Sequence, residues 1–519
     1  MHRNQSHQGT LLCLSLFEQK APKRALAQGL NPVHWQNCGR QGFIPNKNYC
    51  KSCGVTSENG ADSDRGTGAG ADSMRGTRDK ITDVNSEEDI ESSNNNSLDE
   101  ITILEYSQYA MVYKLAQDIL IKLEQHFHAD TASQIFSYAV IMCVNGFINM
   151  DTIKSLYEQS WLSLINKKFG FDMGKTALEN LLYTLAVRGN RVHNYEQAVI
   201  DDCANGKAKI AICCHALRSY SDDNDLAESV YKHSQLNADQ VNLLMGYDAE
   251  RGFPLFARFF RGTAEDQSTV VDTTNLYRFK NILFIVDREF YSEDNLQLFS
   301  KNENSFIIPL PANTEIFNDA MSSIEYTGDF YYRAGKKHTR VEYMERVLAN
   351  GRRIVVYRDI DENEKTRYDY LRSIDQGKAE YTQENYEKNK DFFGVHVLLT
   401  NATLEPQDIF ENYKQRLPIE TFYYFLKNSS NFNNLEIDDY YKKLGFSFIM
   451  LITGQIQHYL EKAVKKLNDN TTSVFDALTM ARFMKIHLNK GSWHVCNLRT
   501  KDLTRMKKIG FEPDKKIIF

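Results

Sequence analysis

One carboxylate, Asp287, directly follows the apolar run Ile282 to Val286. A short continuous apolar run of this kind is typical of a central strand that is covered on both faces. Asp287 is therefore expected at the carboxyl end of a strand, where open α/β sheets gather their ligand sites. Asp is also common after strands because it starts loops, so its position alone leaves a purely structural role open.

A second group of polar residues lies between Tyr413 and Lys427. Pro418 is expected to end one helix and begin another, because proline is excluded from helix interiors but favoured at a first helical position. Glu420 then lies in the first turn of the new helix, where the helix dipole favours negative charge. Glu420 and Lys427 share one face and could serve a metal ion and a phosphate; a solvated helix face is the alternative.

Together these residues resemble a family signature. Four residues with fixed spacing are similar to the Y-R-E-K motif of the insertion-sequence-four-like DDE transposases: Tyr413, Arg416, Glu420 and Lys427. The segment that begins at Asp287 resembles the one that carries the second catalytic acid of that family. The segment from Asn242 to Asp266 resembles these enzymes as well, and the resemblance covers about residues 105–510.

The resemblance implies an RNase H-like fold, a mixed α/β sheet with flanking helices, and phosphoryl transfer on DNA. Asp287 and Glu420 would be catalytic acids that hold Mg²⁺ (or Mn²⁺), with two ions expected. Carboxylate oxygens are the hard ligands that Mg²⁺ requires. The resemblance also implies that Tyr413, Arg416 and Lys427 contact DNA phosphates near the scissile bond, which for the two charged residues means salt-dependent binding.

The first acid of the family is missing. It is expected near the end of the first strand in a context resembling Ile-Ala-Ile-Asp-Gly-His, and here that stretch reads Ile210-Ala-Ile-Cys-Cys-His215. Cys213 thus stands at the expected first-acid position, and a thiol is a soft ligand that holds Mg²⁺ poorly. Cys213 and Cys214 lack zinc-site spacing, so buried strand thiols are the plain interpretation. The nearest acids downstream lie between Asp222 and Asp225, nine to twelve residues further on, and substitution by one of them is the alternative to an impaired site.

We therefore predict a transposase that cleaves DNA and transfers strands at the ends of an insertion sequence. Its partner would be double-stranded DNA, bound by a homodimer, in the cytoplasm of a prokaryote and associated with the nucleoid. The alternative is a catalytically impaired DNA-binding relic of the same family, which Cys213 favours. A housekeeping RNase H-like nuclease is a third possibility, and it would need no DNA-end contact of the Lys427 type.

The first hundred residues carry little pattern of a folded domain. Residues 1–53 form a leader in which four residues could make a small zinc knuckle: His34, Cys38, Cys50 and Cys53. Residues 54–100 are rich in Gly, Asn, Ser and acidic residues, which predicts a disordered linker. Residues 101–200 have apolar residues at helical spacing and no proline, so we expect a helical domain, and the family resemblance implies that this domain binds DNA.

Short apolar runs between helical patterns predict a sheet domain in two parts. A hairpin is expected where Arg340 to Leu348 meets Arg352 to Ile360 across Asn350-Gly351. The expected order is the first part of the catalytic core, a β-rich insertion, the second part of the core and a basic C-terminal helical region: 201–318, 319–390, 391–465 and 466–519.

Composition narrows the class of protein without identifying it. The net charge is −6, but Asn412 to Phe519 holds 18 Lys and Arg against 10 Asp and Glu, which is consistent with a local phosphate-binding face. The nine cysteines are odd in number and scattered, which favours a reducing compartment over a disulfide framework. We expect no membrane span, because no stretch approaches the roughly 20 apolar residues that one requires.

Overall fold

The computed structural model describes a defined subset of the chain: residues 102–203, 208–219, 239–261, 266–334, 337–416, 437, 439–468, 472–496, 499–514 and 516–517. The predicted leader with its zinc ligands, the predicted linker, Glu420 and Lys427 lie outside the described residues.

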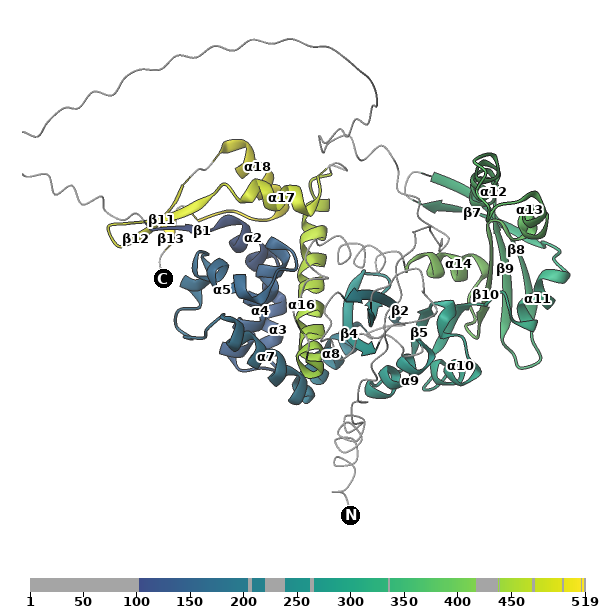
Figure 1. The fold of residues 1–519 in the computed structure, drawn as a ribbon, viewed down its shortest axis with the longest axis horizontal. Helices are drawn as coiled ribbons and strands as arrows, with labels where there is room; N and C mark the ends of the chain where they lie inside the picture. Colours follow the sequence, from purple (N-terminus) through teal and green to yellow (C-terminus); the bar gives the residue numbers. More distant parts are fainter. Residues whose placement is uncertain are drawn as a thin grey trace, which may run out of the picture. The chain divides into compact units, whose positions relative to one another are not determined.

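Helices make up most of the described chain before residue 204, as the apolar spacing predicts. They follow a short strand, β1 (Ile103–Glu105), in this order: α2 (Ser107–Leu115), α3 (Gln117–Glu124), α4 (Ala129–Asn145), α5 (Met150–Glu158), α6 (Leu162–Ile165), α7 (Lys175–Val187) and α8 (Gly189–Cys203). A later helix, α16 (Tyr440–Lys465), packs against α4 and α7 (Figure 1). The approach to α7 is close, since a Cβ on Gly445 would lie 1.9 Å from the carbonyl oxygen of Leu182.

A nine-stranded sheet follows the helices, and five of its strands have the RNase H-like arrangement. They are β2 (Ala208–Ser219), β3 (Asp239–Asp248), β4 (Phe253–Arg261), β5 (Ile282–Val286) and β6 (Ser305–Pro309), in the spatial order β4-β3-β2-β5-β6. The first three are antiparallel neighbours, whereas β5 runs parallel to both β2 and β6. The predicted mixed α/β sheet with flanking helices is therefore confirmed.

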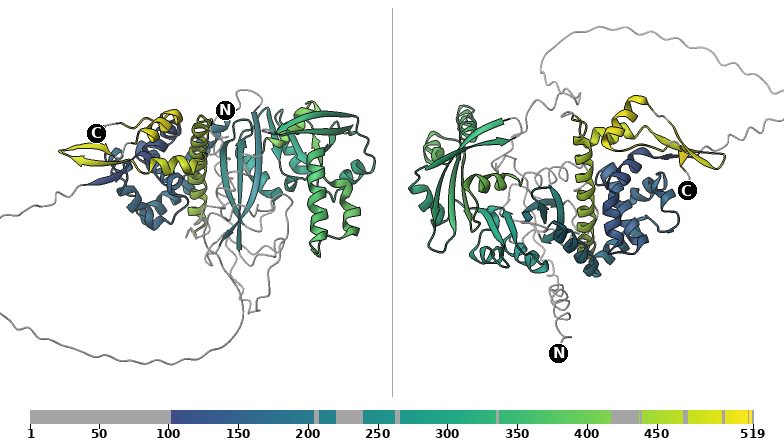
Figure 2. Two further views of the ribbon diagram at one scale, coloured as in Figure 1. Left: turned by 90° about the horizontal axis from the view of Figure 1, so that it is seen from above. Right: turned by 180° about the vertical axis from the view of Figure 1, so that it is seen from behind.

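Helices cover this sheet and join it to the helical part. Three short ones follow the strands: α9 (Asp266–Leu276), α10 (Glu293–Phe299) and α11 (Glu315–Ser322). The long helix α16 contacts β4 as well as α4 and α7, so it belongs to the core of both parts (Figure 2).

The predicted insertion continues the same sheet. Its strands are β7 (Gly328–Ala334), β8 (Lys337–Val347) and β9 (Arg353–Asp359), and β9 pairs with β10 (Val395–Thr400), which in turn pairs with β6. The hairpin expected across Asn350-Gly351 is confirmed, and Gly351 has a φ of +78° that suits glycine. The charged stretch after it forms α12 (Ile360–Asp375), α13 (Gln383–Asn389) and the short turn η4 (Lys390–Phe392).

The C-terminal region differs from the helical region that the sequence predicts. It contains α17 (Val474–Ala481) and α18 (Thr500–Ile509), but also β11 (Lys485–Asn489), β12 (Ser492–Cys496) and β13 (Lys516–Ile517). These three strands form a four-stranded sheet with β1 from the other end of the described chain. The hairpin turns at Lys490-Gly491, where both residues have positive φ, and this Lys-Gly turn was the local signal for strands.

Among the described residues, no single helix is long and apolar enough to cross a membrane. One bent pair, α4 with α5, passes the same test of length and composition, with 97° between the two helices.

Candidate active site

The expected positions of the first and second acids lie side by side in the sheet. β2 and β5 are parallel, and their register pairs Ala211 with Ile285 and Ile212 with Val286. One step further along both strands, Cys213 comes level with Asp287. Neighbouring strands are about 4.8 Å apart and aligned residues of parallel strands point to the same face. The strand alignment that assigned Cys213 to the first-acid position is therefore consistent with the register.

The surroundings of these two residues differ. Cys213 is 4% exposed and pairs across β2–β3 with Met245, which is fully buried. The Asp287 side chain is 38% exposed. The thiol is thus covered by the surrounding protein, whereas the carboxylate can be reached from solvent.

Local backbone geometry fixes Asp287 at the end of β5. All five residues of β5 are buried, and Asp287 continues in an extended conformation with φ −79° and ψ 157°. Its Oδ1 atom accepts a hydrogen bond of 2.8 Å from the Arg288 backbone N–H, at the start of the short helix η3 (Arg288–Phe290). One carboxylate oxygen is therefore partly used as a cap.

The helix α14 (Pro406–Lys414) brings the start of the predicted motif to this carboxylate. Arg416 lies just beyond the helix, and its Nη1 atom is 3.3 Å from Asp287 Oδ1. The Arg416 guanidinium also stacks over the Tyr413 ring, at 4.6 Å from the ring centroid, and Tyr413 itself is buried. The structure therefore unites Asp287 with Tyr413 and Arg416, which follow it more than 120 residues later in the chain.

Strand β9 of the insertion holds the beginning of α14. Arg353 donates hydrogen bonds to the backbone oxygens of Ala402 and Leu404, and the Tyr357 hydroxyl donates one of 2.7 Å to the Pro406 oxygen. Pro406 occupies the first turn, where proline is favoured because its missing N–H would have no helical partner. The insertion is therefore part of the support of the site.

Three residues near the end of α14 were missed by the sequence reasoning. Glu362 on α12, His396 on β10 and Lys414 on α14 form one cluster of polar side chains in contact. Each comes from a different element, and helix and strand spacing give no signal for such a meeting. The sequence shows a glutamate, Glu362, at the start of a charged helical stretch, but it does not indicate that His396 and Lys414 contact it.

The described residues by themselves do not complete a site for two Mg²⁺ ions. No group of three or more His, Cys, Asp or Glu side chains in the described part of the chain could hold a metal ion. At the two level strand positions, one residue is a soft thiol and the other a carboxylate that is paired with Arg416. Glu420, the remaining predicted ligand, lies outside the described residues.

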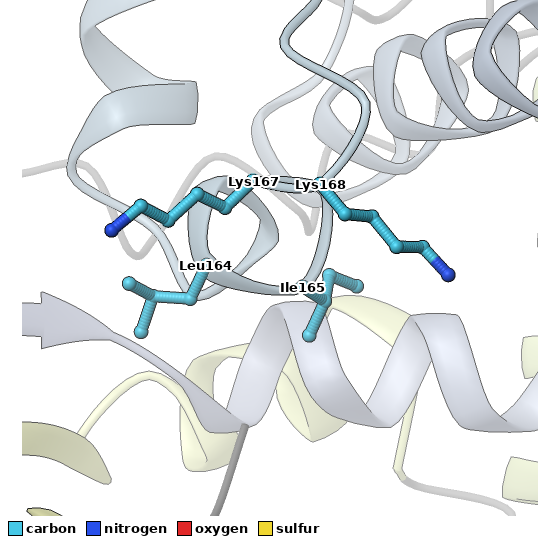
Figure 3. A pocket seen from close by; sticks show the side chains of 4 residues that line it. All are labelled: Leu164, Ile165, Lys167 and Lys168. Atoms are coloured by element: carbon cyan, nitrogen blue, oxygen red, sulfur yellow. The ribbon is translucent and has the colours of Figure 1, made fainter.

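A pocket among the described residues lies elsewhere, in the helical part. It is lined by Leu164, Ile165, Lys167 and Lys168, and the two lysine side chains extend in different directions from the turn after α6 (Figure 3). Lys168 stacks over the Phe169 ring at 4.7 Å, and both lysines are exposed. Two apolar side chains and two exposed lysines line this shallow hollow, and none of the four is a metal ligand.

Comparison with known proteins gives a family match for the sheet domain. The model of the transposase DDE domain matches residues 222–452, which is less than half of the chain. The matched range includes Asp287 and the predicted motif residues, and it begins after Cys213. The match supports a DDE transposase domain. No curated protein matches the chain.

One similar solved structure is the cryo-EM structure of a piggyBac transposase synaptic complex with hairpin DNA. The identity is 9% and the TM-score 0.36, with 78% of this chain and 81% of that chain covered. A TM-score this low adds no argument to the strand order and the family match.

Proposed function

We propose that this chain is a transposase that cleaves and joins DNA at the ends of an insertion sequence. The observation that carries the proposal is the meeting of Asp287 with Arg416 at 3.3 Å, because it unites a strand-end acid with the motif that follows it 126 residues later. The family match over residues 222–452 supports a transposase in general. The insertion-sequence class rests on the Y-R-E-K resemblance.

In this proposal the residues of the site have distinct roles. Asp287 and Glu420 would hold divalent metal ions, which would supply Lewis-acid activation of the phosphodiester when bound. Arg416 and Lys427 would bind DNA phosphates next to the scissile bond, and Tyr413, which is buried beneath the Arg416 guanidinium, would reach them beside it. The partner would be double-stranded DNA, with two copies of the chain acting on two ends in a prokaryotic cytoplasm.

A second candidate is a DNA-binding relic of the same family that has lost catalysis. Cys213 favours it, because the position level with Asp287 offers no hard oxygen ligand. In such a protein Arg416 would still bind DNA phosphates, and Asp287 would hold its guanidinium in place. The two candidates differ in one respect: both bind the DNA ends, and only the first nicks them with Mg²⁺ or Mn²⁺.

Removing the charge of Arg416 tests both candidates at once. We expect Arg416→Gln to weaken binding to DNA that flanks the coding sequence by about 10- to 100-fold, since a charged hydrogen bond contributes roughly 1.5–3 kcal/mol. Fluorescence anisotropy at constant salt measures the change. Arg340→Gln removes an equal charge from an exposed pair with Asp329 and serves as the control. Equal effects of the two variants would contradict a role of Arg416 in DNA binding.

We propose that the helical part also contacts DNA, as expected for residues 101–200, and this contact can be tested separately from Arg416. Lys167 and Lys168 form no ion pair among the described residues, whereas Lys154 of the same helical part pairs with Glu158 and Asp172. We expect Lys167→Gln with Lys168→Gln to reduce the slope of log affinity against log salt by up to about 1.8, at roughly 0.9 per lost phosphate contact. Two single substitutions, each measured over a salt series, should contribute comparably.

Lys154→Gln is the matched control, because its charge is already balanced by two acids. It should leave the slope unchanged. An unchanged slope in the Lys167 and Lys168 variants would remove this pocket from the DNA-binding surface, while the role proposed for Arg416 would stand.

A further inference from the structure

A cluster of charged side chains lies at the end of α14 and is not part of the family motif. It joins Glu362 on α12, His396 on β10 and Lys414, the last residue of α14. His396 Nε2 is 3.0 Å from Glu362 Oε2, and Lys414 Nζ is 3.2 Å from the same oxygen. Lys414 Nζ is also 3.2 Å from His396 Nε2. One carboxylate oxygen of Glu362 therefore holds two partners from two other elements.

The cluster is partly shielded from solvent, more at His396 and Lys414 than at Glu362. The side chains of His396 and Lys414 are each 20% exposed, and that of Glu362 is 42% exposed. Phe410 covers it, since Lys414 Nζ lies 5.1 Å from its ring centroid and the His396 ring lies 6.0 Å away. The hydrogen bond from His396, followed by the attraction of Lys414, lowers the pKa of Glu362 to about 2. The carboxylate is therefore ionised at any pH at which the protein would act.

The cluster is connected to the candidate active site through adjacent residues. The centroid of the Tyr413 ring lies 6.1 Å from that of the His396 ring, and the Arg416 guanidinium lies over the Tyr413 ring at 4.6 Å. Arg416 then reaches Asp287. A continuous series of contacts thus leads from the insertion, through the last turn of α14, to the carboxylate at the end of β5.

The two ends of α14 are held in different ways. Backbone oxygens near its beginning accept hydrogen bonds from Arg353 and Tyr357 of β9. At its end, Lys414 meets Glu362 and His396, and Arg416 follows two residues later. A change in the orientation of the last turn would move Arg416 relative to Asp287, because the guanidinium is carried by the residues that directly follow this turn.

We propose that Glu362 is a positioning residue: by holding Lys414 and His396, it sets the last turn of α14 and so places Arg416 and Tyr413 against Asp287. Glu362 touches neither DNA nor metal in this proposal and acts through Arg416. The proposal rests on the function proposed above, in which Arg416 binds DNA. It assigns to the insertion a role in shaping the DNA-contacting surface.

The test compares Glu362→Gln with Glu364→Gln in the full-length protein. Glu364 lies on the same helix and is exposed, so its substitution removes the same charge without touching the cluster. We expect Glu362→Gln to weaken DNA binding by about three- to tenfold, within the range of coupling between residues in one network. Glu364→Gln should leave binding unchanged. The melting temperature of each variant is measured alongside, to show that both fold.

A double-mutant cycle with Arg416→Gln separates positioning from a general structural role. If Glu362 acts through Arg416, Glu362→Gln should have little further effect on DNA affinity once Arg416 is already replaced. If the same loss appears in both backgrounds, the proposal is wrong. The reciprocal exchange Glu362→Lys with Lys414→Glu supplies a second measurement, and it should recover part of the affinity lost in either single variant.

The outcomes also separate this proposal from the one it rests on. Loss of binding in Arg416→Gln together with normal binding in Glu362→Gln overturns the positioning role and leaves the proposed function standing. Normal binding in Arg416→Gln overturns the DNA contact proposed for Arg416, and the positioning role falls with it, since Glu362 acts through Arg416 in this proposal.

Discussion

Replacing Cys213 with aspartate is expected to raise the rate of Mg²⁺-dependent nicking of element-end DNA by about ten- to hundredfold. Outer-shell partners of metal ligands already affect metal affinity or activity by that factor, and this substitution restores a direct ligand. The reason is geometric: Cys213 lies one step beyond the Ile212–Val286 pair, level with Asp287 on the neighbouring parallel strand. Nicking of a labelled duplex by the purified proteins, with Mg²⁺ and with Mn²⁺, measures the change.

The neighbouring thiol provides a matched control. Successive residues of a strand point to opposite faces, so Cys214→Asp adds the same carboxylate on the face away from Asp287. It should not raise nicking. Cys213→Ser replaces the thiol by a hydroxyl of similar size and adds no carboxylate, so it should also leave nicking unchanged. If Cys213→Asp and the original protein nick DNA at the same rate, the assignment of Cys213 to the first-acid position is wrong.

Stability gives a readout of the same substitution that does not depend on catalysis. Cys213 is buried, so an aspartate there costs folding free energy without a cation beside it, through desolvation and repulsion from Asp287. A metal ion that binds only the folded protein offsets this cost. We therefore expect Mn²⁺ to raise the melting temperature of Cys213→Asp more than that of the original protein. A metal-independent melting temperature would argue against a restored site.

Much of the sheet could be predicted from sequence because its strands are short, apolar and separated by clear turns. The run Ile282 to Val286 gave β5 without error, and Asn350-Gly351 gave the turn between β8 and β9. In both cases the deciding interactions lie within a few residues. The RNase H-like class of the sheet was predicted from the family resemblance, since periodicity does not determine which strands become neighbours.

The candidate site could be predicted only in part, for the same reason. Asp287 was placed at a strand end by local pattern alone. Its ion pair with Arg416, in contrast, depends on how the insertion packs under α14, and no spacing rule describes that packing. The cluster of Glu362, His396 and Lys414 was missed entirely because each residue belongs to a separate element.

The C-terminal strands were missed because their pairing is non-local. β11 and β12 are each five residues long, and β11 pairs with β1, which lies more than 370 residues earlier in the chain. The strongly basic composition of this region favoured a helical interpretation. Composition describes which surfaces are charged, and it contains little information about which strand edges find a partner.

The junction between helical part and sheet contains a buried ion pair whose loss should be the most damaging single change to stability. Glu196 on α8 is fully buried and Arg258 on β4 is 16% exposed, with 2.9 Å between Arg258 Nη1 and Glu196 Oε1. The Tyr277 hydroxyl donates a further hydrogen bond of 2.8 Å to Glu196 Oε2. Arg258→Met should lower the free energy of unfolding by about 3–5 kcal/mol, because it leaves a buried carboxylate with one partner fewer.

The loss of unfolding free energy in Arg258→Met is expected to depend on pH. Burial raises the pKa of Glu196 even with Arg258 beside it, so removing Arg258 should raise this pKa further. When the pKa of an acid is higher in the folded than in the unfolded protein, the free energy of unfolding falls as the pH rises from the lower pKa to the higher one. At lower pH the acid is protonated in both states, and the loss of stability disappears. The deficit of Arg258→Met in urea unfolding should therefore be smaller at pH 5 than at pH 8. Adding Glu196→Gln should recover part of the loss at pH 8, whereas an equal deficit at both pH values would mean that Arg258 stabilises the junction by packing rather than by charge.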